Sequence, residues 1–128
     1  MNFGLTTEQQ LVKQMITEFA IKEVEPIAAE IDENEIFPME TVKKMAKAGI
    51  MGMMYPKEYG GAGADYISYI TVVEELAKVC ATTSVILSAH CSLGCGTIYE
   101  YGSEDQKKKY LPDLLSGKKL AAFALTEP

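Results

Sequence analysis

The sequence predicts an all-α domain, a bundle of about five helices, and three observations predict it. Apolar residues recur at three- and four-residue spacing through most of the chain. Residues that cap helices precede most of these apolar runs, and glycines follow several of them. The 128 residues are enough to bury a core, and 48% hydrophobic with 23% charged residues is ordinary for a globular protein.

The first predicted helical segment contains a proline. Thr6 or Thr7 can cap its start, and a glutamine lies three residues after each of them, as a capping box requires. Apolar side chains then recur at four-residue spacing from Leu11. We expect Pro26 to break or kink the helix, and the apolar stripe to continue to about residue 32.

A short helix is predicted over residues 39–48, with Gly49 as its C-terminal cap. The stretch 51–64 is irregular, and the glycines within 60–63 invite comparison with a phosphate-binding loop. A dinucleotide fingerprint needs a preceding strand and a βαβ unit, which the surrounding sequence does not predict. A tight turn into a helix cap at Asp65 explains these glycines better.

Two central helices are predicted over residues 66–79 and about 83–101. The first is apolar on nearly every side, which predicts burial on more than one face. The second ends at Gly102, and its inward residues are unusually small, so that another backbone or a ligand can approach closely. The pattern alone leaves open tight helix packing and a ligand channel. The small residues are Ser84, Ser88, Ala89, Cys91, Ser92, Gly94, Cys95 and Gly96.

A fifth helix and an apolar strand complete the predicted elements. Ser103 and Gln106 form a capping box for the helix, which ends near residues 116–117. The apolar run that follows is typical of the opening strand of a sheet, yet one strand is not stable without partners. We therefore expect residues 1–118 to be a helical domain and 119–128 to be the truncated start of a β-domain.

Charge and composition argue against several classes of protein. The net charge is −6 and the sequence contains no arginine, whereas nucleic-acid backbones are read by basic patches. The longest uncharged stretch, 79–99, holds too many Ser, Thr and Gly residues for a membrane span. Three cysteines and an amino terminus without a secretion signal favour a reducing cytoplasm.

Metal and catalytic sites are not predicted from the residues. Cys80, His90, Cys91 and Cys95 are metal-ligand types, but the Cys-x-x-Cys spacing of a structural zinc site is absent. Free cysteine also behaves as a small buried hydrophobe, and a core or interface histidine is the simpler reading of His90. The chain offers no Ser-His-Asp order and no obvious carboxylate pair.

Six segments, in order, resemble the acyl-CoA dehydrogenase family, and most of all its short-chain, butyryl-CoA type from anaerobic bacteria. The run Phe-Ala-Leu-Thr-Glu-Pro at 123–128 resembles the start of the signature that opens the central β-domain of that family. The other five segments are 5–9, 55–63, 74–77, 88–94 and 101–107.

This resemblance implies an FAD-dependent enzyme that oxidises a short-chain acyl-CoA to a trans-2-enoyl-CoA and passes electrons to an electron-transfer flavoprotein. The family places its glutamate base in a carboxy-terminal domain, so no catalytic residue is expected in this chain. The fragment alone is expected to be inactive and to bind FAD weakly or not at all, while the full-length protein is expected to be a tetramer. A non-catalytic helical module that binds acyl-CoA or a partner protein stays an alternative, as do an acyl-CoA oxidase and a flavin monooxygenase.

The resemblance also implies roles for two groups of three residues. The flavin-contacting positions are Phe123, Leu125 and Thr126. The positions that line the acyl chain are Ile86, Ala89 and Leu93. A branched Ile86 that points into the cavity would favour a short acyl chain. Without the resemblance, residues 123–126 are an ordinary apolar strand.

Overall fold

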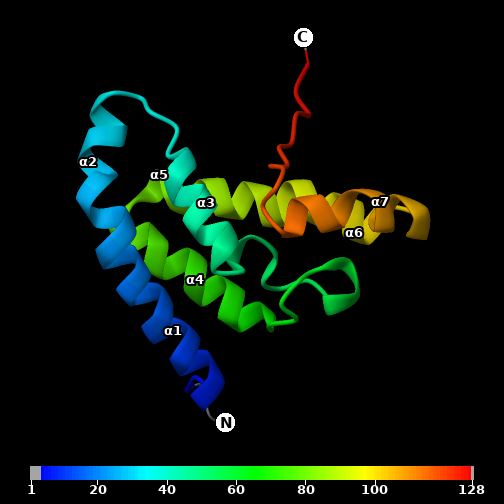
Figure 1. Cartoon of the computed structure of the whole chain (residues 1–128), viewed down its shortest axis with the longest axis horizontal. Helices are drawn as coiled ribbons and strands as arrows, with labels where there is room; N and C mark the ends of the chain where they lie inside the picture. The colour runs from blue at the N-terminus through cyan, green and yellow to red at the C-terminus, as the bar shows by residue number, and fades with distance from the viewer. Residues whose placement is uncertain (1–3, 128) are drawn as a thin grey trace.

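The computed structural model describes residues 4–127, and the regular secondary structure in this range is helical throughout (Figure 1). The predicted all-α class is confirmed. Several helices join end to end, so that they form the five predicted helical segments. The α-helices are α1 (Thr7–Phe19), α2 (Glu25–Glu33), α3 (Met39–Lys47), α4 (Tyr66–Val79), α5 (Ala81–Ser88), α6 (Gly96–Tyr101) and α7 (Glu104–Leu115).

The first segment is one long helical rod that runs through Pro26. A π turn, η1 (Ala20–Val24), joins α1 to α2, and the Glu25 N–H bonds to the carbonyl of Ala20. A proline ring crowds the carbonyl four residues before it, and a widened turn relieves that crowding. The helix therefore continues through Pro26, and its irregularity lies in the turn just before the proline. The Thr6 capping box forms as predicted.

Helices α1 and α4 pack against each other along their length (Figure 1). Gln9 Nε2 donates to the carboxylate of Asp65 at 2.7 Å, and Asp65 also caps α4 by accepting from the Ser68 N–H at 2.7 Å. Further along, Glu75 is 7% exposed and lies 3.4 Å from Lys13 Nζ and 2.7 Å from Lys78 Nζ. The two contacts that cross between the helices, Gln9 with Asp65 and Lys13 with Glu75, fix the register of α1 on α4.

The apolar core lies between α1 and α4 and continues between α4, α5, α7 and the inner face of α3. Burying one such side chain contributes roughly 1.5–3 kcal/mol, so these residues supply most of the stabilisation of the fold. Its largest fully buried apolar side chains are Ile16, Val24, Val42, Met45, Ile50, Met51, Tyr69, Val72, Leu76, Leu87 and Leu111.

The glycine-rich loop between α3 and α4 is a turn whose amides bond within the protein. It contains two 3-10 turns, η2 (Ile50–Gly52) and η3 (Lys57–Tyr59). Gly60 and Gly63 adopt positive φ angles of 93° and 72°. The Gly61 N–H donates to the Pro56 carbonyl at 3.1 Å, and the Gly63 N–H to the Tyr55 carbonyl at 2.9 Å. Because these amides already have partners, the loop does not offer them to a phosphate.

The helix predicted over residues 83–101, which contains the small residues, is also nearly continuous. It begins two residues earlier than predicted, because Cys80 caps α5 through its sulfur, which accepts from the Thr83 N–H at 3.5 Å. A π-helical stretch, η4 (Ala89–Cys95), then joins α5 to α6. The Ser103 capping box of α7 forms as predicted.

After α7 the chain turns at Gly117 and leaves the bundle as an extended segment (Figure 1). Residues 120–127 have no regular secondary structure, so the expected opening strand is not formed in the described part of the chain. The physical reason is that a single strand is not stable alone, because its backbone groups need a neighbouring strand to form hydrogen bonds. The division at residue 118 stays a prediction, and Pro128 lies outside the described residues.

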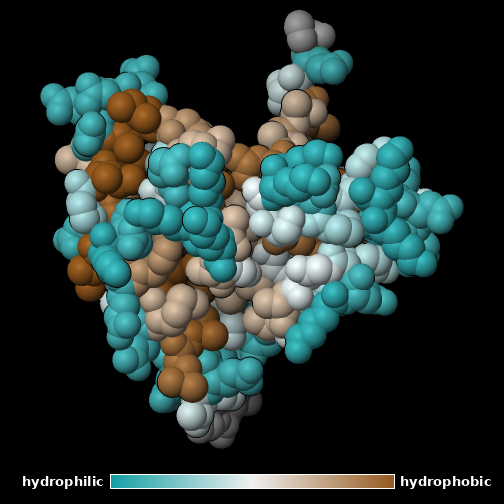
Figure 2. All heavy atoms as spheres, in the orientation of Figure 1, coloured by the Kyte–Doolittle hydropathy of each residue, from teal (hydrophilic) through white to brown (hydrophobic). Residues whose placement is uncertain are grey.

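Apolar side chains gather on the surface over α2 and the loop that follows it (Figure 2). Ile36, Phe37 and Met39 are each about half exposed there. Within residues 4–127, no helix has both the length and the apolar character that crossing a membrane requires.

Candidate functional site

A groove of about 330 Å³ lies between the helix α5–η4 and the extended carboxy-terminal segment. The helix forms one wall, the segment forms the facing wall, and the loop between α2 and α3 closes one end. The lining residues are Phe37, Val85, Ile86, Ala89, His90, Leu93, Leu120, Ala121, Ala122 and Phe123.

The structure brings four of the six predicted site residues to this groove. Ile86, Ala89 and Leu93 are spaced by three and four residues, so they share one helix face. Phe123, half exposed, approaches them from the facing segment although it is distant in the sequence. Leu125 and Thr126 are exposed and lie outside the groove, further along the extended segment.

Sequence reasoning missed the other six residues of the lining, and Val85 and Phe37 show two different reasons. Val85 lies four residues before Ala89, is 63% exposed, and belongs to the same helix face. Helical spacing alone could have found it. Phe37 comes from a loop 49 residues away from Ile86, and no local pattern predicts that contact.

His90 lies at the base of the groove and is 1% exposed. Its Nδ1 accepts the Ala121 N–H at 3.0 Å, so this nitrogen has no proton and the neutral ring carries its proton on Nε2. Nε2 lies 3.6 Å from Cys95 Sγ. Burial lowers the pKa of His90 below its ordinary value, while backbone carbonyls of Leu114 and Met51 oppose that change. His90 is therefore a neutral core histidine.

Gly94 explains how the extended segment comes so close to the helix. A Cβ added at Gly94 would lie 2.2 Å from the Cβ of Ala121, which is far below a normal contact. The small-residue helix thus serves both purposes that the sequence left open. It admits another backbone at Gly94 and leaves a groove beside Ala89.

The groove can hold a hydrocarbon chain but offers no proton acceptor of its own. Its lining is apolar apart from His90, whose Nδ1 already has a partner. The thiols nearby are unreactive, because burial raises the pKa of both Cys91 and Cys95 to about 12. Among the residues that the structure describes, no three His, Cys, Asp or Glu side chains converge as metal ligands.

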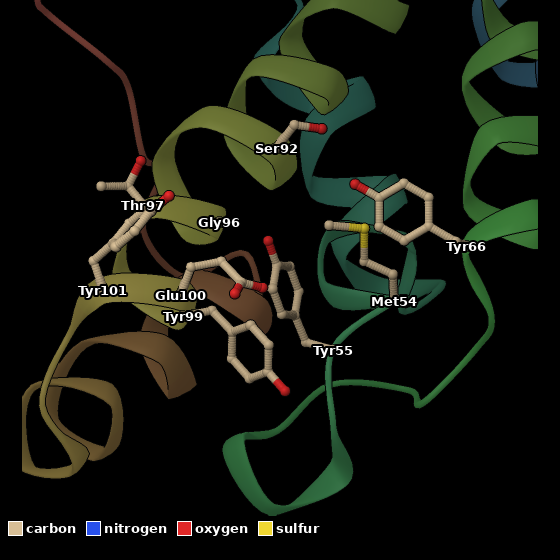
Figure 3. Close-up of a pocket in the computed structure, with 9 residues that line it drawn as sticks. All are labelled: Met54, Tyr55, Tyr66, Ser92, Gly96, Thr97, Tyr99, Glu100 and Tyr101. Atoms are coloured by element: carbon tan, nitrogen blue, oxygen red, sulfur yellow. The ribbon is translucent and has the colours of Figure 1, made fainter.

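A second hollow of about 370 Å³ lies on the other side of η4 (Figure 3). Tyr66 reaches it from α4 and Glu100 from α6. The Tyr55 hydroxyl donates to the Cys91 carbonyl at 2.5 Å, and burial raises its pKa. None of the six predicted residues lines it. The lining residues are Met54, Tyr55, Tyr66, Ser92, Gly96, Thr97, Tyr99, Glu100 and Tyr101.

Comparisons with known proteins agree on one family. The model of the family "Acyl-CoA dehydrogenase, N-terminal domain" matches residues 6–118. A short-chain specific acyl-CoA dehydrogenase of Clostridium acetobutylicum is 62% identical over 128 residues, which are 100% of this chain and 34% of that protein. The chain thus spans about a third of the length of this curated relative.

Two solved structures have the same fold. A chain of the structure described as the electron transferring flavoprotein of Acidaminococcus fermentans has a TM-score of 0.95 and 46% identity, over 100% of this chain and 34% of that one. The acyl-CoA dehydrogenase of Bacillus anthracis, solved in complex with FAD, has a TM-score of 0.89 and 34% identity, over 97% of this chain and 21% of that one.

Proposed function

Because this chain belongs to the acyl-CoA dehydrogenase family and matches the amino-terminal domain of that family, we propose that it is part of an FAD-dependent enzyme. That enzyme oxidises a short-chain acyl-CoA to the trans-2-enoyl-CoA. The proposed electron acceptor is an electron-transfer flavoprotein, and the similarity to a chain in such a structure supports it. The full-length protein is proposed to be a cytoplasmic homotetramer that binds neither nucleic acid nor membrane.

The groove beside α5–η4 is the observation that supports this function best. It is apolar, about 330 Å³ in volume, and lined by a helix face of small and medium side chains. Such a surface suits the hydrocarbon part of an acyl thioester. In this proposal, Ile86, Ala89 and Leu93 contact the acyl chain, and the relative that is specific for short chains supports the chain length.

The extended segment suits the proposed flavin contact. The flavin, when bound, accepts the hydride that leaves the substrate. Within residues 122–127, no backbone hydrogen bond to the helices is formed, so these groups are available to a ligand or a neighbouring strand. Phe123, Leu125 and Thr126 are the proposed contacts, with the exposed Thr126 hydroxyl as a donor.

The test uses the full-length protein that contains this chain. We expect it to purify yellow with FAD, and we expect butyryl-CoA to bleach the visible flavin absorbance under anaerobic conditions. A folded, colourless full-length protein would contradict the proposal and favour a binding module. Bleaching followed by rapid formation of hydrogen peroxide in air would instead identify an acyl-CoA oxidase.

The 128-residue chain alone should have no dehydrogenase activity and bind FAD weakly or not at all. The groove supplies no proton acceptor, and the extended segment has no partner strands. Flavin absorbance that comigrates with this chain in gel filtration would contradict this expectation.

A further inference from the structure

We propose that His90 is a positioning residue that sets the flavin-contacting segment against the acyl groove, by accepting the backbone N–H of Ala121. The inference rests on the proposed function, and it adds a residue to which that proposal gives no role. His90 lies at the base of the proposed acyl groove, but no part of the reaction is assigned to it. It acts through the segment that begins at Ala121.

The hydrogen bond between Ala121 N and His90 Nδ1, 3.0 Å long, is the last one that ties the segment to the helices. The preceding tie is the Lys119 N–H, which donates to the Asp113 carbonyl at 3.0 Å. Within the described residues 122–127, no hydrogen bond to the bundle follows. The direction in which the segment leaves the bundle is therefore set at Ala121.

A second contact holds the same residue. The Cβ of Ala121 occupies the space that a side chain at position 94 would fill, 2.2 Å from where a Cβ of that side chain would lie. His90 and Gly94 are four residues apart and thus lie on the same helix face. His90 accepts the backbone N–H of Ala121, and Gly94 leaves the space that the Ala121 methyl group fills. Together the two contacts fix both the position and the orientation of Ala121.

Histidine suits this place because its ring is rigid and bifunctional. Nδ1 accepts outward from the helix, while the Nε2 proton faces the core beside Cys95 Sγ at 3.6 Å. The ring is almost fully buried, and a neutral buried acceptor has little freedom to move. Residue 123 is two positions beyond Ala121, roughly 7 Å along an extended chain. A displacement at Ala121 therefore reaches the wall of the groove.

The experiment compares three variants of the full-length protein. His90→Leu removes the acceptor, and His90→Asn keeps an amide oxygen near the position of Nδ1. Ser84→Ala is the matched control, because its hydroxyl donates to the Val73 carbonyl at 2.8 Å on the same helix but faces α4. Two quantities are measured: hydrogen exchange of the Ala121 amide, and the Kd for FAD by titration of the apoprotein.

We expect His90→Leu to accelerate exchange at Ala121 and to raise the Kd for FAD about tenfold, as the loss of one net hydrogen bond would. His90→Asn should restore most of both, and Ser84→Ala should change neither. Unchanged exchange and Kd in His90→Leu would overturn the inference. Equal effects of Ser84→Ala would overturn it too, because the role of His90 would then be general stability.

Two further measurements cover the case in which His90→Leu does not fold. Gly94→Ala should displace Ala121 and accelerate its exchange, whereas Gly96→Ala, whose added Cβ would lie 3.4 Å from its nearest neighbour, should not. In the unaltered protein, nitrogen NMR should find Nδ1 of His90 unprotonated and coupled to the Ala121 amide. A protonated Nδ1 would overturn the inference.

If the full-length protein bound no FAD, the proposed function would fail, while the exchange measurements would still test the contact between His90 and Ala121.

Discussion

At the scale of single residues, the ring of His90 is held through both of its nitrogens. It is the only histidine in the sequence, and a buried neutral ring accepts the Ala121 N–H. The titratable groups beside it are the thiols of Cys91 and Cys95, which stay neutral because burial raises the pKa of each to about 12. Protonation of His90 would therefore place a positive charge in the core with neither thiol ionised to balance it.

Acidification should destabilise this chain through His90. The unfolded chain protonates the residue near pH 6.5, while burial lowers the pKa of the folded state below that value. Between the two values the unfolded state binds more protons, so the free energy of unfolding falls as pH decreases below 6.5. Urea unfolding of the 128-residue chain at pH 7 and pH 5.5 should show this loss.

The same experiment on His90→Asn provides the control, because its side chain does not titrate. The carboxylates with a lowered pKa, including Asp65 and Glu75, lose stabilisation only as pH falls through lower values. An equal loss of stability between pH 7 and pH 5.5 in both proteins would contradict the assignment.

Ile86 should limit the length of the acyl chain in the full-length enzyme. It projects from the helix face that lines the groove, and its removal enlarges the apolar space. We expect Ile86→Ala to shift the preference in kcat/KM from butyryl-CoA toward hexanoyl- and octanoyl-CoA. An extra methylene in an apolar pocket is worth roughly 1–3 kcal/mol, so the ratio should change about tenfold or more. Ile98→Ala, on α6 and outside the groove, should leave the ratio unchanged.

At this scale, helical spacing could place Ile86, Ala89 and Leu93 on one face, since a helix has a fixed period. The family resemblance, rather than spacing, singled out these three residues and Phe123 as site residues. The contact of His90 with Ala121 spans 31 residues, and nothing local in the sequence encodes it. Phe37 was missed for the same reason.

At the scale of helices, the caps were predictable and the π turns were not. Thr6, Asp65 and Ser103 each cap the helix that their sequence context predicts, because a capping interaction spans only three residues. The π turns η1 and η4 each shift the hydrogen bonding by one residue, a change too small to alter the apolar pattern. Pro26 was a local clue to η1, whereas η4 has none in its sequence.

Asp65 should matter more than an ordinary helix cap, because it joins two helices. It accepts from the Ser68 N–H at the start of α4 and from Gln9 of α1, each at 2.7 Å. We expect Asp65→Ala to lower the urea midpoint more than Ser103→Ala, whose capping box is local to α7. Asp65→Asn should recover much of the loss because it keeps an acceptor oxygen. Equal midpoints for the two alanine variants would show that the contact with Gln9 adds nothing.

At the scale of the whole molecule, the bundle depends on α4, whose apolar residues face α1 on one side and α5 on the other. The sequence predicted this burial from an apolar character on nearly every side of the helix. It could not predict which helix covers each side, since packing partners depend on the complete fold. The strand predicted after α7 depends in the same way on elements that the described residues do not contain.

Leu76→Ala should therefore be among the costly substitutions in this chain. Leu76 is fully buried in α4, and truncation of a buried leucine costs about 2–5 kcal/mol of unfolding free energy. Leu11→Ala on α1, where the side chain is 63% exposed, should change stability by no more than about 0.5 kcal/mol. Chemical denaturation of both variants measures the difference, and similar values for the two would contradict this account of the core.

The three buried thiols described above also make it possible to measure local opening of the bundle by chemical modification. Cys80, Cys91 and Cys95 are free and buried, with 8%, 0% and 0% of their surface exposed. A thiol-specific reagent can modify Cys91 or Cys95 only after α5–η4–α6 separates from the core. The rate of modification in native buffer thus measures how often the helix beside the groove detaches. Addition of an acyl-CoA or FAD to the full-length protein would slow that rate if either ligand holds the helix closed.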